Sequence, residues 1–184
     1  MKFLKKESSI ATTKTQKDIH NKGEIIITDK KIVTQKINEL YQEKKNEFLN
    51  TLSWETVKEI CSFSYLMQVE PNTKIVETDT VEQEVYVILE GKFEIELPNG
   101  CLFDLLPGEI FGEVGFFLDS GKRTASIQAT EKSSVLVILR SIIKKIANKN
   151  SRAAYEIVHQ FGKIMAKRLE LDRNIIRNMR CGII

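Results

Sequence analysis

Short runs of β-branched and aromatic residues follow one another through the middle of the chain and alternate with turn residues. Runs of this kind predict β-strands, and Pro98-Asn99-Gly100 predicts a hairpin between two of them. Many short strands joined by turns are typical of an antiparallel jelly-roll barrel. The predicted strands are Lys74–Glu77, Glu84–Leu89, Lys92–Leu97, Cys101–Leu105, Ser126–Thr130 and Ser134–Leu139.

Helical periodicity precedes the first of these strands. Apolar residues recur at helical spacing between Lys30 and Leu49, which predicts one amphipathic helix over this range. Ser53 fits the N-cap of a second helix that ends at Ile60, and Glu55 in its first turn favours the helix dipole. The apolar face of the first helix comprises Val33, Ile37, Leu40, Tyr41 and Phe48.

The same periodicity returns after the last strand. Residues 141–149 and 151–179 predict two helices, and the second carries one apolar stripe. Its other face is rich in lysine and arginine, a pattern that usually marks a solvated surface. The stripe comprises Ile157, Phe161, Ile164, Met165, Leu169 and Ile176.

This order of elements predicts a mainly β domain with flanking helices, in the α+β class. The centre is an antiparallel β jelly-roll barrel with N-terminal helices and C-terminal helices. We expect residues 1–29 to be polar and mobile apart from a short strand at Glu24–Thr28. Residues 30–60 then form the N-terminal helices, 61–140 the barrel, and 141–184 the C-terminal helices, which act as lid and signalling element.

Composition supports a single domain. The chain has 184 residues, of which 42% are hydrophobic, enough for one core. It contains no apolar run long enough for a membrane span and no signal-peptide core, so we expect a cytoplasmic protein. The three cysteines, Cys61, Cys101 and Cys181, lack metal or disulfide spacing and are expected to be free thiols.

Charge is distributed unevenly along the sequence. Residues 1–50 carry 11 basic and 7 acidic residues, 51–133 carry 6 and 15, and 134–184 carry 11 and 3, for a total of +3. Because the middle is acidic, an anion site there depends on local groups and not on the general field.

The middle segment nevertheless contains a candidate anion site. Gly112 allows close backbone approach, and the N–H groups of Val114 and Gly115 after it would lie at the start of a short helical turn, which attracts phosphate. Arg123 offers a planar fork for two phosphate oxygens. Glu113 could accept a hydrogen bond from a ribose hydroxyl. This set of groups fits a ribose 3′,5′-cyclic phosphate.

Several motifs together resemble the cyclic nucleotide-binding domains shared by bacterial catabolite activator proteins, protein kinase A regulatory subunits and hyperpolarisation-gated channels. The resemblance covers residues 52 to about 173 and implies the jelly-roll fold. Asp79 stands where many members carry glycine, but aspartate tolerates left-handed backbone, so we expect this turn to survive. The motifs are Tyr86-Val87-Ile88-Leu89-Glu90-Gly91, Leu106-Pro107-Gly108-Glu109, Phe111-Gly112-Glu113 and Arg123-Thr124-Ala125.

The resemblance also implies a role for individual residues. Arg123 is similar to the family's phosphate arginine and Glu113 to its ribose acceptor. We call residues 111–115 and 123–125 together the cassette. The resemblance implies that its phosphate-facing backbone and hydroxyl groups belong to Gly112, Val114, Gly115, Thr124 and Ala125.

Other positions correspond to groups around the base. Ile95 and Leu102 match residues that flank it, although apolar strand residues are as often simply core. Asp172 and Arg173 on the last helix match the position that closes the pocket.

The hypothesis that follows is a cyclic nucleotide receptor for cAMP, or else cGMP. Occupancy of the pocket would rearrange the terminal helices and so control an unidentified protein partner. We expect no DNA-binding domain, no metal site and no catalytic residues, and therefore no enzyme. Arg123→Ala is expected to abolish nucleotide binding while leaving the fold intact.

A different class of function is the alternative. A degenerate member could bind no nucleotide and act as a protein- or nucleic-acid-interaction scaffold through its basic last helix. A homodimer through that helix is compatible with either hypothesis.

Overall fold

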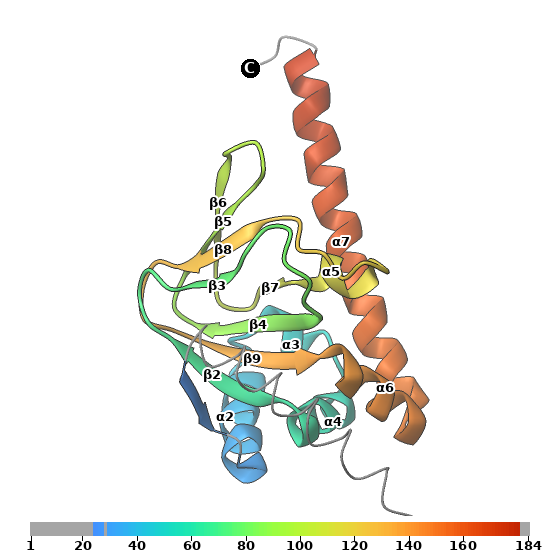
Figure 1. Cartoon of the computed structure of the whole chain (residues 1–184). Helices are drawn as coiled ribbons and strands as arrows, with labels where there is room; N and C mark the ends of the chain where they lie inside the picture. The colour runs from blue at the N-terminus through green and yellow to red at the C-terminus, as the bar shows by residue number, and fades with distance from the viewer. Residues whose placement is uncertain (1–23, 28, 181–184) are drawn as a thin grey trace, which may run out of the picture.

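The structure, a computed structural model, describes residues 24–27 and 29–180. Its strands are β1 (Glu24–Ile27), β2 (Tyr65–Val69), β3 (Lys74–Val76), β4 (Glu84–Glu90), β5 (Phe93–Glu96), β6 (Leu102–Leu105), β7 (Ile110–Phe111), β8 (Ser126–Ala129) and β9 (Ser133–Leu139). They form a five-stranded sheet of order β1-β2-β9-β4-β7 and a four-stranded sheet of order β3-β8-β5-β6 (Figure 1). The paired strands are antiparallel, which confirms the predicted jelly roll.

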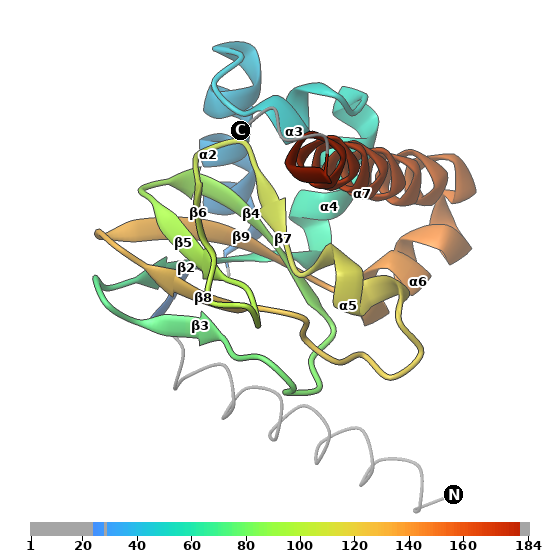
Figure 2. The same ribbon diagram turned by 90° about the horizontal axis from the view of Figure 1, so that it is seen from above.

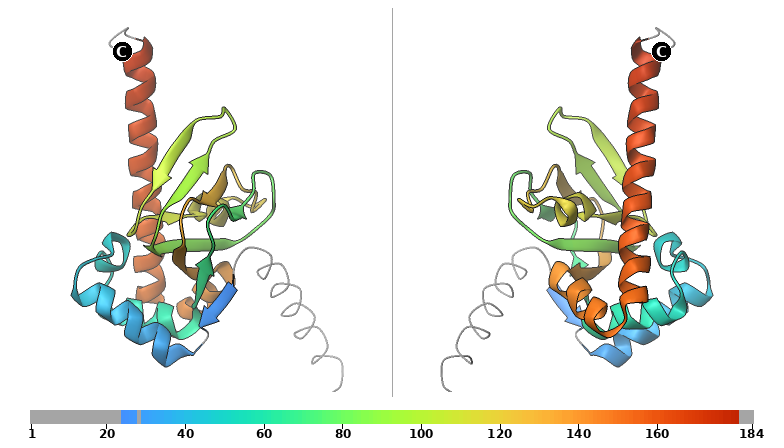
Figure 3. Two further views of the ribbon diagram at one scale, coloured as in Figure 1. Left: turned by 90° about the vertical axis from the view of Figure 1, so that its left-hand side faces the viewer. Right: turned by 90° about the vertical axis from the view of Figure 1, so that its right-hand side faces the viewer.

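Helices gather on one side of the five-stranded sheet (Figure 2). They are α2 (Lys30–Gln42), α3 (Glu47–Asn50), α4 (Trp54–Phe63), α6 (Arg140–Lys149) and α7 (Ser151–Arg180), while the short α5 (Glu113–Phe117) follows β7. The C-terminal end of α7 extends beyond the sheets (Figure 3). The prediction of a mainly β domain with flanking helices is therefore confirmed.

Both faces of the five-stranded sheet are buried, which explains the near-continuous apolar runs of β4 and β9. Successive side chains of a strand point to opposite faces. In β4, Val85 and Val87 face the helices, whereas Tyr86 and Ile88 face the other sheet. The chain thus has two apolar cores, one between sheet and helices and one between the sheets.

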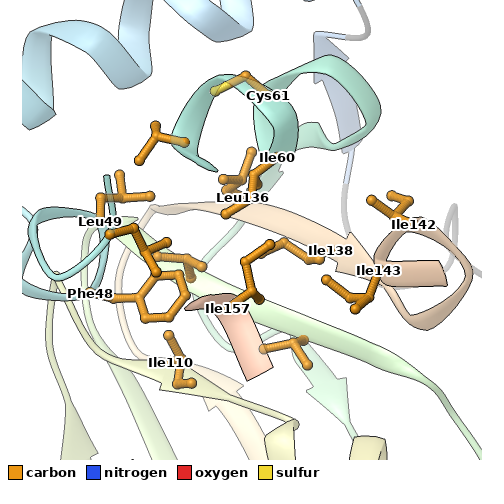
Figure 4. Close-up of a cluster of buried hydrophobic side chains, with 14 of the residues drawn as sticks. Phe48, Leu49, Ile60, Cys61, Ile110, Leu136, Ile138, Ile142, Ile143 and Ile157 are labelled. Atoms are coloured by element: carbon orange, nitrogen blue, oxygen red, sulfur yellow. The ribbon is translucent and has the colours of Figure 1, made fainter. Parts of the chain in front are cut away.

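The helix-side core joins segments from both ends of the sequence. Phe48 of α3 and Phe161 of α7 stack with ring centroids 5.7 Å apart. Figure 4 shows Leu136 and Ile138 of β9 among the side chains contributed by α3, α4, α6 and α7. The helices that the sequence placed at its two ends therefore form one layer.

The predicted helix from Lys30 to Leu49 is wrong as a single element. It ends at Gln42, Lys44 adopts a positive φ of 53°, and a separate short helix starts at Glu47. The cause is Asn46, which is fully buried. Its Oδ1 accepts from Leu49 N–H at 3.0 Å, and its Nδ2 donates to the Ile88 carbonyl at 2.9 Å. A tertiary contact to β4 outweighs continued helical periodicity.

Two strands lie outside the predicted set. β2 pairs with β9 in the middle of the five-stranded sheet, and β7 pairs with β4 through only Tyr86–Phe111 and Val87–Ile110. The possible strand near Glu24 is present as β1, paired with β2. The expectation of mobility for residues 1–29 otherwise falls mostly outside the described residues.

The cysteines were expected to be free, and this is confirmed for Cys61 and Cys101. Burial raises the pKa of the Cys61 thiol to about 12, so it stays protonated at neutral pH, while Cys101 is exposed. Cys181 lies outside the described residues. Within the described part of the chain, each helix is too short or too polar to cross a lipid bilayer.

A polar junction connects α4 to α7. Ser53, the N-cap of α4 as predicted, donates to the Glu156 carboxylate through its backbone N–H at 3.1 Å and its hydroxyl at 2.7 Å. The Thr56 hydroxyl donates to the same oxygen at 2.7 Å. Next to the cap, the Trp54 ring packs against Tyr41 of α2 with centroids 5.1 Å apart. The junction fixes the start of α7 to the N-terminal helices.

The Glu156 carboxylate should make folding stability pH-dependent. The Thr56 and Ser53 hydrogen bonds lower its pKa below the ordinary value of 4.5. Its contribution is therefore complete above pH 4.5 and is lost as the pH falls through the lowered folded-state pKa. Glu156→Gln should lower the free energy of unfolding by about 1 to 2 kcal/mol at pH 7. Urea denaturation at pH 7 and in acid checks this, because wild type and variant should converge in acid; parallel curves would contradict it.

Candidate functional site

The predicted phosphate segment is a tight turn between β7 and α5. Gly112 is the N-cap of α5 with φ of 88°, and it makes no side-chain capping bond. The first N–H groups of a helix have no intrahelical acceptor, so they are available to an anion. A Cβ at Gly112 would lie 2.5 Å from the Glu84 carbonyl oxygen and 2.7 Å from Arg123 Nη1. Only glycine fits this position.

The Arg123 side chain is folded into the protein and is 2% exposed. Its Nε donates to Glu82 Oε2 at 3.3 Å, and its Nη1 to the Gly112 carbonyl at 3.0 Å. Its Nη2 donates to both the carbonyl oxygen and Oε2 of Glu84, at 2.8 and 3.2 Å. The expected phosphate arginine therefore lies against the cassette turn, where it is already hydrogen-bonded to the protein.

The backbone of Arg123 is fixed by the turn that departs from the family pattern. Arg123 N–H donates to the Thr80 carbonyl at 2.8 Å, and Asp79 N–H donates to the Arg123 carbonyl at 3.0 Å. Asp79 has φ of 67°, the left-handed conformation that its side chain tolerates. The prediction that this turn survives with aspartate is confirmed.

Glu113, the expected ribose acceptor, is buried and paired with a residue that the sequence did not single out. Its Oε1 accepts from Arg168 Nη1 of α7, and Arg168 Nη2 donates to the Ile110 carbonyl at 2.7 Å. The Glu113 side chain is 2% exposed and that of Arg168 34%. The last helix thus reaches the cassette through an ion pair.

The pocket-closing position expected at Asp172 and Arg173 is not where α7 meets the cassette. Arg168 makes that contact, and Arg173 is exposed to solvent. The two positions lie more than one helical turn beyond Arg168 along α7. The signal that could have identified Arg168 is its place in the basic face of the helix, but that face holds many equivalent cations.

The expected base-flanking pair is separated by the strand register. Ile95 is paired with Phe103, and Leu102 with Glu96. Since adjacent residues on a strand point to opposite faces, Ile95 and Leu102 do not share a face. Ile95 packs against the core between the sheets, whereas Leu102 is 55% exposed. Phe103, paired with Ile95 and 49% exposed, is the residue of β6 that shares a face with Ile95, and the sequence analysis did not name it.

The remaining cassette residues differ in their exposure to solvent. Gly115 and Ala125 are buried, Val114 is half-buried and Thr124 is exposed. A Cβ at Gly115 would lie 3.3 Å from Arg123 Nη1, so both glycines border the same guanidinium. The structure therefore brings the two cassette motifs together around Arg123.

Aromatic rings support this site from inside the barrel. Tyr86 and Phe111 stack at 4.9 Å, and Arg123 Cζ lies 5.9 Å from the Tyr86 ring centroid. Burial, with a further contribution from Glu84, raises the pKa of Tyr86 well above 10. The same two causes raise the pKa of Tyr65. Tyr86 is therefore neutral, and with Phe111 it forms an apolar floor beneath a cation flanked by carboxylates.

The fold is a jelly roll, and its candidate site combines the glycine turn before α5 with the Arg123 guanidinium. Residues 66–150 match the family model described as cyclic nucleotide-binding domain. These residues therefore form a domain of the cyclic nucleotide-binding family.

Several known proteins are similar to this chain. The cGMP-dependent protein kinase egl-4 of Caenorhabditis elegans is 24% identical over 106 residues, which cover 58% of this chain and 14% of the kinase. The Pycsar effector protein PaPycTIR of Pseudomonas aeruginosa is 28% identical over 83 residues, 45% of this chain and 27% of the effector. The matches thus include only a small part of each relative.

Solved structures share the fold. A cyclic nucleotide-binding domain from Methylobacillus flagellatus kt superposes with a TM-score of 0.64 at 18% identity, covering 78% of this chain and 83% of its own. The catabolite activator protein of Thermus thermophilus gives 0.59 at 23% identity, covering 70% and 61%. At these identities the likeness concerns the fold.

Proposed function

We propose that this chain is a receptor for a cyclic nucleotide and not an enzyme. The observation that carries the proposal is the meeting of the Gly112 turn, Glu113 and Arg123 at one place within the family domain. A cyclic phosphate would lie against the first-turn N–H groups of α5 and the Arg123 guanidinium. The ribose 2′-hydroxyl would donate to Glu113, and the base would lie on the face of Ile95 and Phe103.

Calorimetric titration with cAMP and with cGMP tests this proposal. Heat that saturates with micromolar affinity or tighter supports a receptor, and the ratio of the two affinities identifies the preferred base. The similar kinases are named as cGMP-dependent, and the exposed Thr124 hydroxyl could donate to or accept from a guanine edge, so both nucleotides belong in the first experiment.

The proposed signal passes through Arg168. Arg168 and the ribose hydroxyl are both donors to the same buried carboxylate, so filling the pocket alters the free energy of the pair between α5 and α7. By linkage, the position of α7 must equally alter nucleotide affinity, typically by about 1 to 3 kcal/mol. Because Glu156 fixes the start of this helix to α4, a change at Arg168 is also connected to the N-terminal helices.

Removal of Arg168 should uncouple α7 from the pocket. In the wild type, saturating nucleotide is expected to change amide hydrogen exchange in α7; in Arg168→Ala this change should disappear. Lys167→Ala is the matched control, since it removes an exposed cation from the neighbouring position. Amide hydrogen exchange of α7, measured by mass spectrometry with and without nucleotide, tests this expectation. A ligand-induced change in α7 that persists in Arg168→Ala would exclude this route.

One observation favours the scaffold as a second candidate. Both Arg123 and Glu113 have protein partners, so each can satisfy hydrogen bonds within the protein. Absence of heat with either nucleotide would support an interaction scaffold, with the basic surface of α7 as the part to test next.

A further inference from the structure

Arg123 has too few remaining donors to bind a phosphate as it stands. A guanidinium has five N–H groups. In Arg123, four of these N–H groups donate hydrogen bonds within the protein. The acceptors are Glu82 Oε2, the Gly112 carbonyl, and the carbonyl and Oε2 of Glu84. A bidentate contact to a phosphate needs two donors. At least one protein acceptor must therefore leave before a phosphate can bind in this way.

The four acceptors differ in how easily they can leave. The Glu84 carbonyl belongs to β4, which is paired with β9 from its first residue, and the Gly112 carbonyl accepts the Phe116 N–H of α5 at 3.3 Å. Moving either would disturb backbone structure. The two carboxylates are on side chains, and a rotamer change leaves the strand and helix hydrogen bonds in place; the one backbone contact released by Glu84 Oε2 is the exposed Gln83 N–H, which it accepts at 3.0 Å. The acceptor that gives way is therefore a carboxylate.

Charge points to the same groups. Glu82 and Glu84 are both ion-paired to the one guanidinium, with side chains only 16% and 15% exposed. A phosphate that reaches Arg123 is brought close to both carboxylates in a region of weak solvent screening. Like charges about 5 Å apart repel by roughly 3 kcal/mol at an effective dielectric constant of about 20.

We propose that Glu84, together with Glu82, acts as a built-in competitor for Arg123 and so sets the affinity for the cyclic phosphate. The proposal rests on the proposed receptor function. Glu84 is the stronger candidate because its Oε2 and its own carbonyl oxygen occupy both N–H groups of Nη2. Displacement of that one carboxylate oxygen frees a donor next to Nη1, whose second N–H completes a bidentate pair.

The test compares nucleotide affinities of glutamine variants. Glu84→Gln keeps the size and an acceptor oxygen but removes the charge, and it is expected to bind cAMP or cGMP about tenfold more tightly than the wild type. Glu82→Gln should change affinity in the same direction by a smaller factor. Glu70→Gln is the control, because it removes one charge from an exposed side chain that pairs with Lys132 and not with Arg123. Thermal unfolding confirms that each variant is folded.

The outcomes separate this proposal from the receptor proposal. If the wild type binds and neither Glu84→Gln nor Glu82→Gln binds more tightly, the carboxylates position Arg123 instead of competing for it, and this inference alone is overturned. If only the glutamine variants bind, the competition is strong enough to block the wild type, which supports this inference and contradicts the receptor proposal for the wild-type chain. If the folded wild type, the Glu84→Gln variant and a variant carrying both Glu82→Gln and Glu84→Gln all fail to bind either nucleotide, both proposals are wrong.

Discussion

Replacement of Arg123 by alanine is expected to lower the free energy of unfolding by about 3 kcal/mol as well as to abolish nucleotide binding. The buried guanidinium is paired with Glu82 and Glu84, and the substitution would leave two neighbouring carboxylates without this cation. It would also leave the Gly112 carbonyl without its Arg123 donor. Urea denaturation at pH 7 measures the loss. The expectation from sequence alone, that the fold stays intact, treated Arg123 as a ligand contact only.

Arg123→Lys separates the two effects of this residue. Lysine retains the charge but not the planar fork, so binding should be lost while stability falls by less than in the alanine variant. An unfolding curve for Arg123→Ala that overlays the wild type would show that the buried ion pairs contribute little. Wild-type affinity in either variant would contradict the assignment of Arg123 to the phosphate.

The second large effect is expected at Gly112. Gly112→Ala should destabilise the protein by about 3 kcal/mol and weaken nucleotide binding severely. The left-handed backbone disfavours any Cβ, and this one would approach the Glu84 carbonyl oxygen to 2.5 Å and Arg123 Nη1 to 2.7 Å. Either the turn opens or the arginine moves. Urea denaturation and calorimetry on the same sample report both losses.

Gly100→Ala provides the matched control for this substitution. Gly100 has φ of 79°, close to that of Gly112, but no atom lies within 4 Å of its ideal Cβ position. It should therefore show only the conformational cost, about 1 to 2 kcal/mol. Equal effects of the two substitutions would mean that the contacts around Gly112 adjust without cost.

Local pattern was sufficient for most of the fold. Turn residues such as Pro98-Asn99-Gly100 and the cap at Ser53 act through their own backbone, so the sequence predicts them directly. The break before α3 was not predictable in this way. It depends on Asn46 reaching the Ile88 carbonyl, a contact between residues far apart in the chain.

In the candidate site, too, the local motif could be predicted from the sequence, whereas the long-range contacts could not. The cassette around Gly112 and Arg123 is a motif and could be predicted, although its role in binding stays a prediction. The partners of Arg123 could not, because Glu82 and Glu84 are two among many acidic residues in the middle of the chain and only the fold directs them to it. Arg168 was missed because helix periodicity does not say which cation stands opposite Glu113.

The chain contains a single tryptophan, and its place in the structure decides what its fluorescence can report. Trp54 packs on Tyr41 of α2 and follows Ser53, which donates to Glu156 of α7. It therefore belongs to the helix layer and not to the cassette. Its fluorescence emission therefore reports changes at the junction between the N-terminal helices and α7. A titration followed by emission and one followed by heat therefore measure different events on one molecule. Coinciding midpoints would mean that filling the pocket and moving the helices form one transition, whereas heat without an emission change would confine the motion to α7 beyond Glu156.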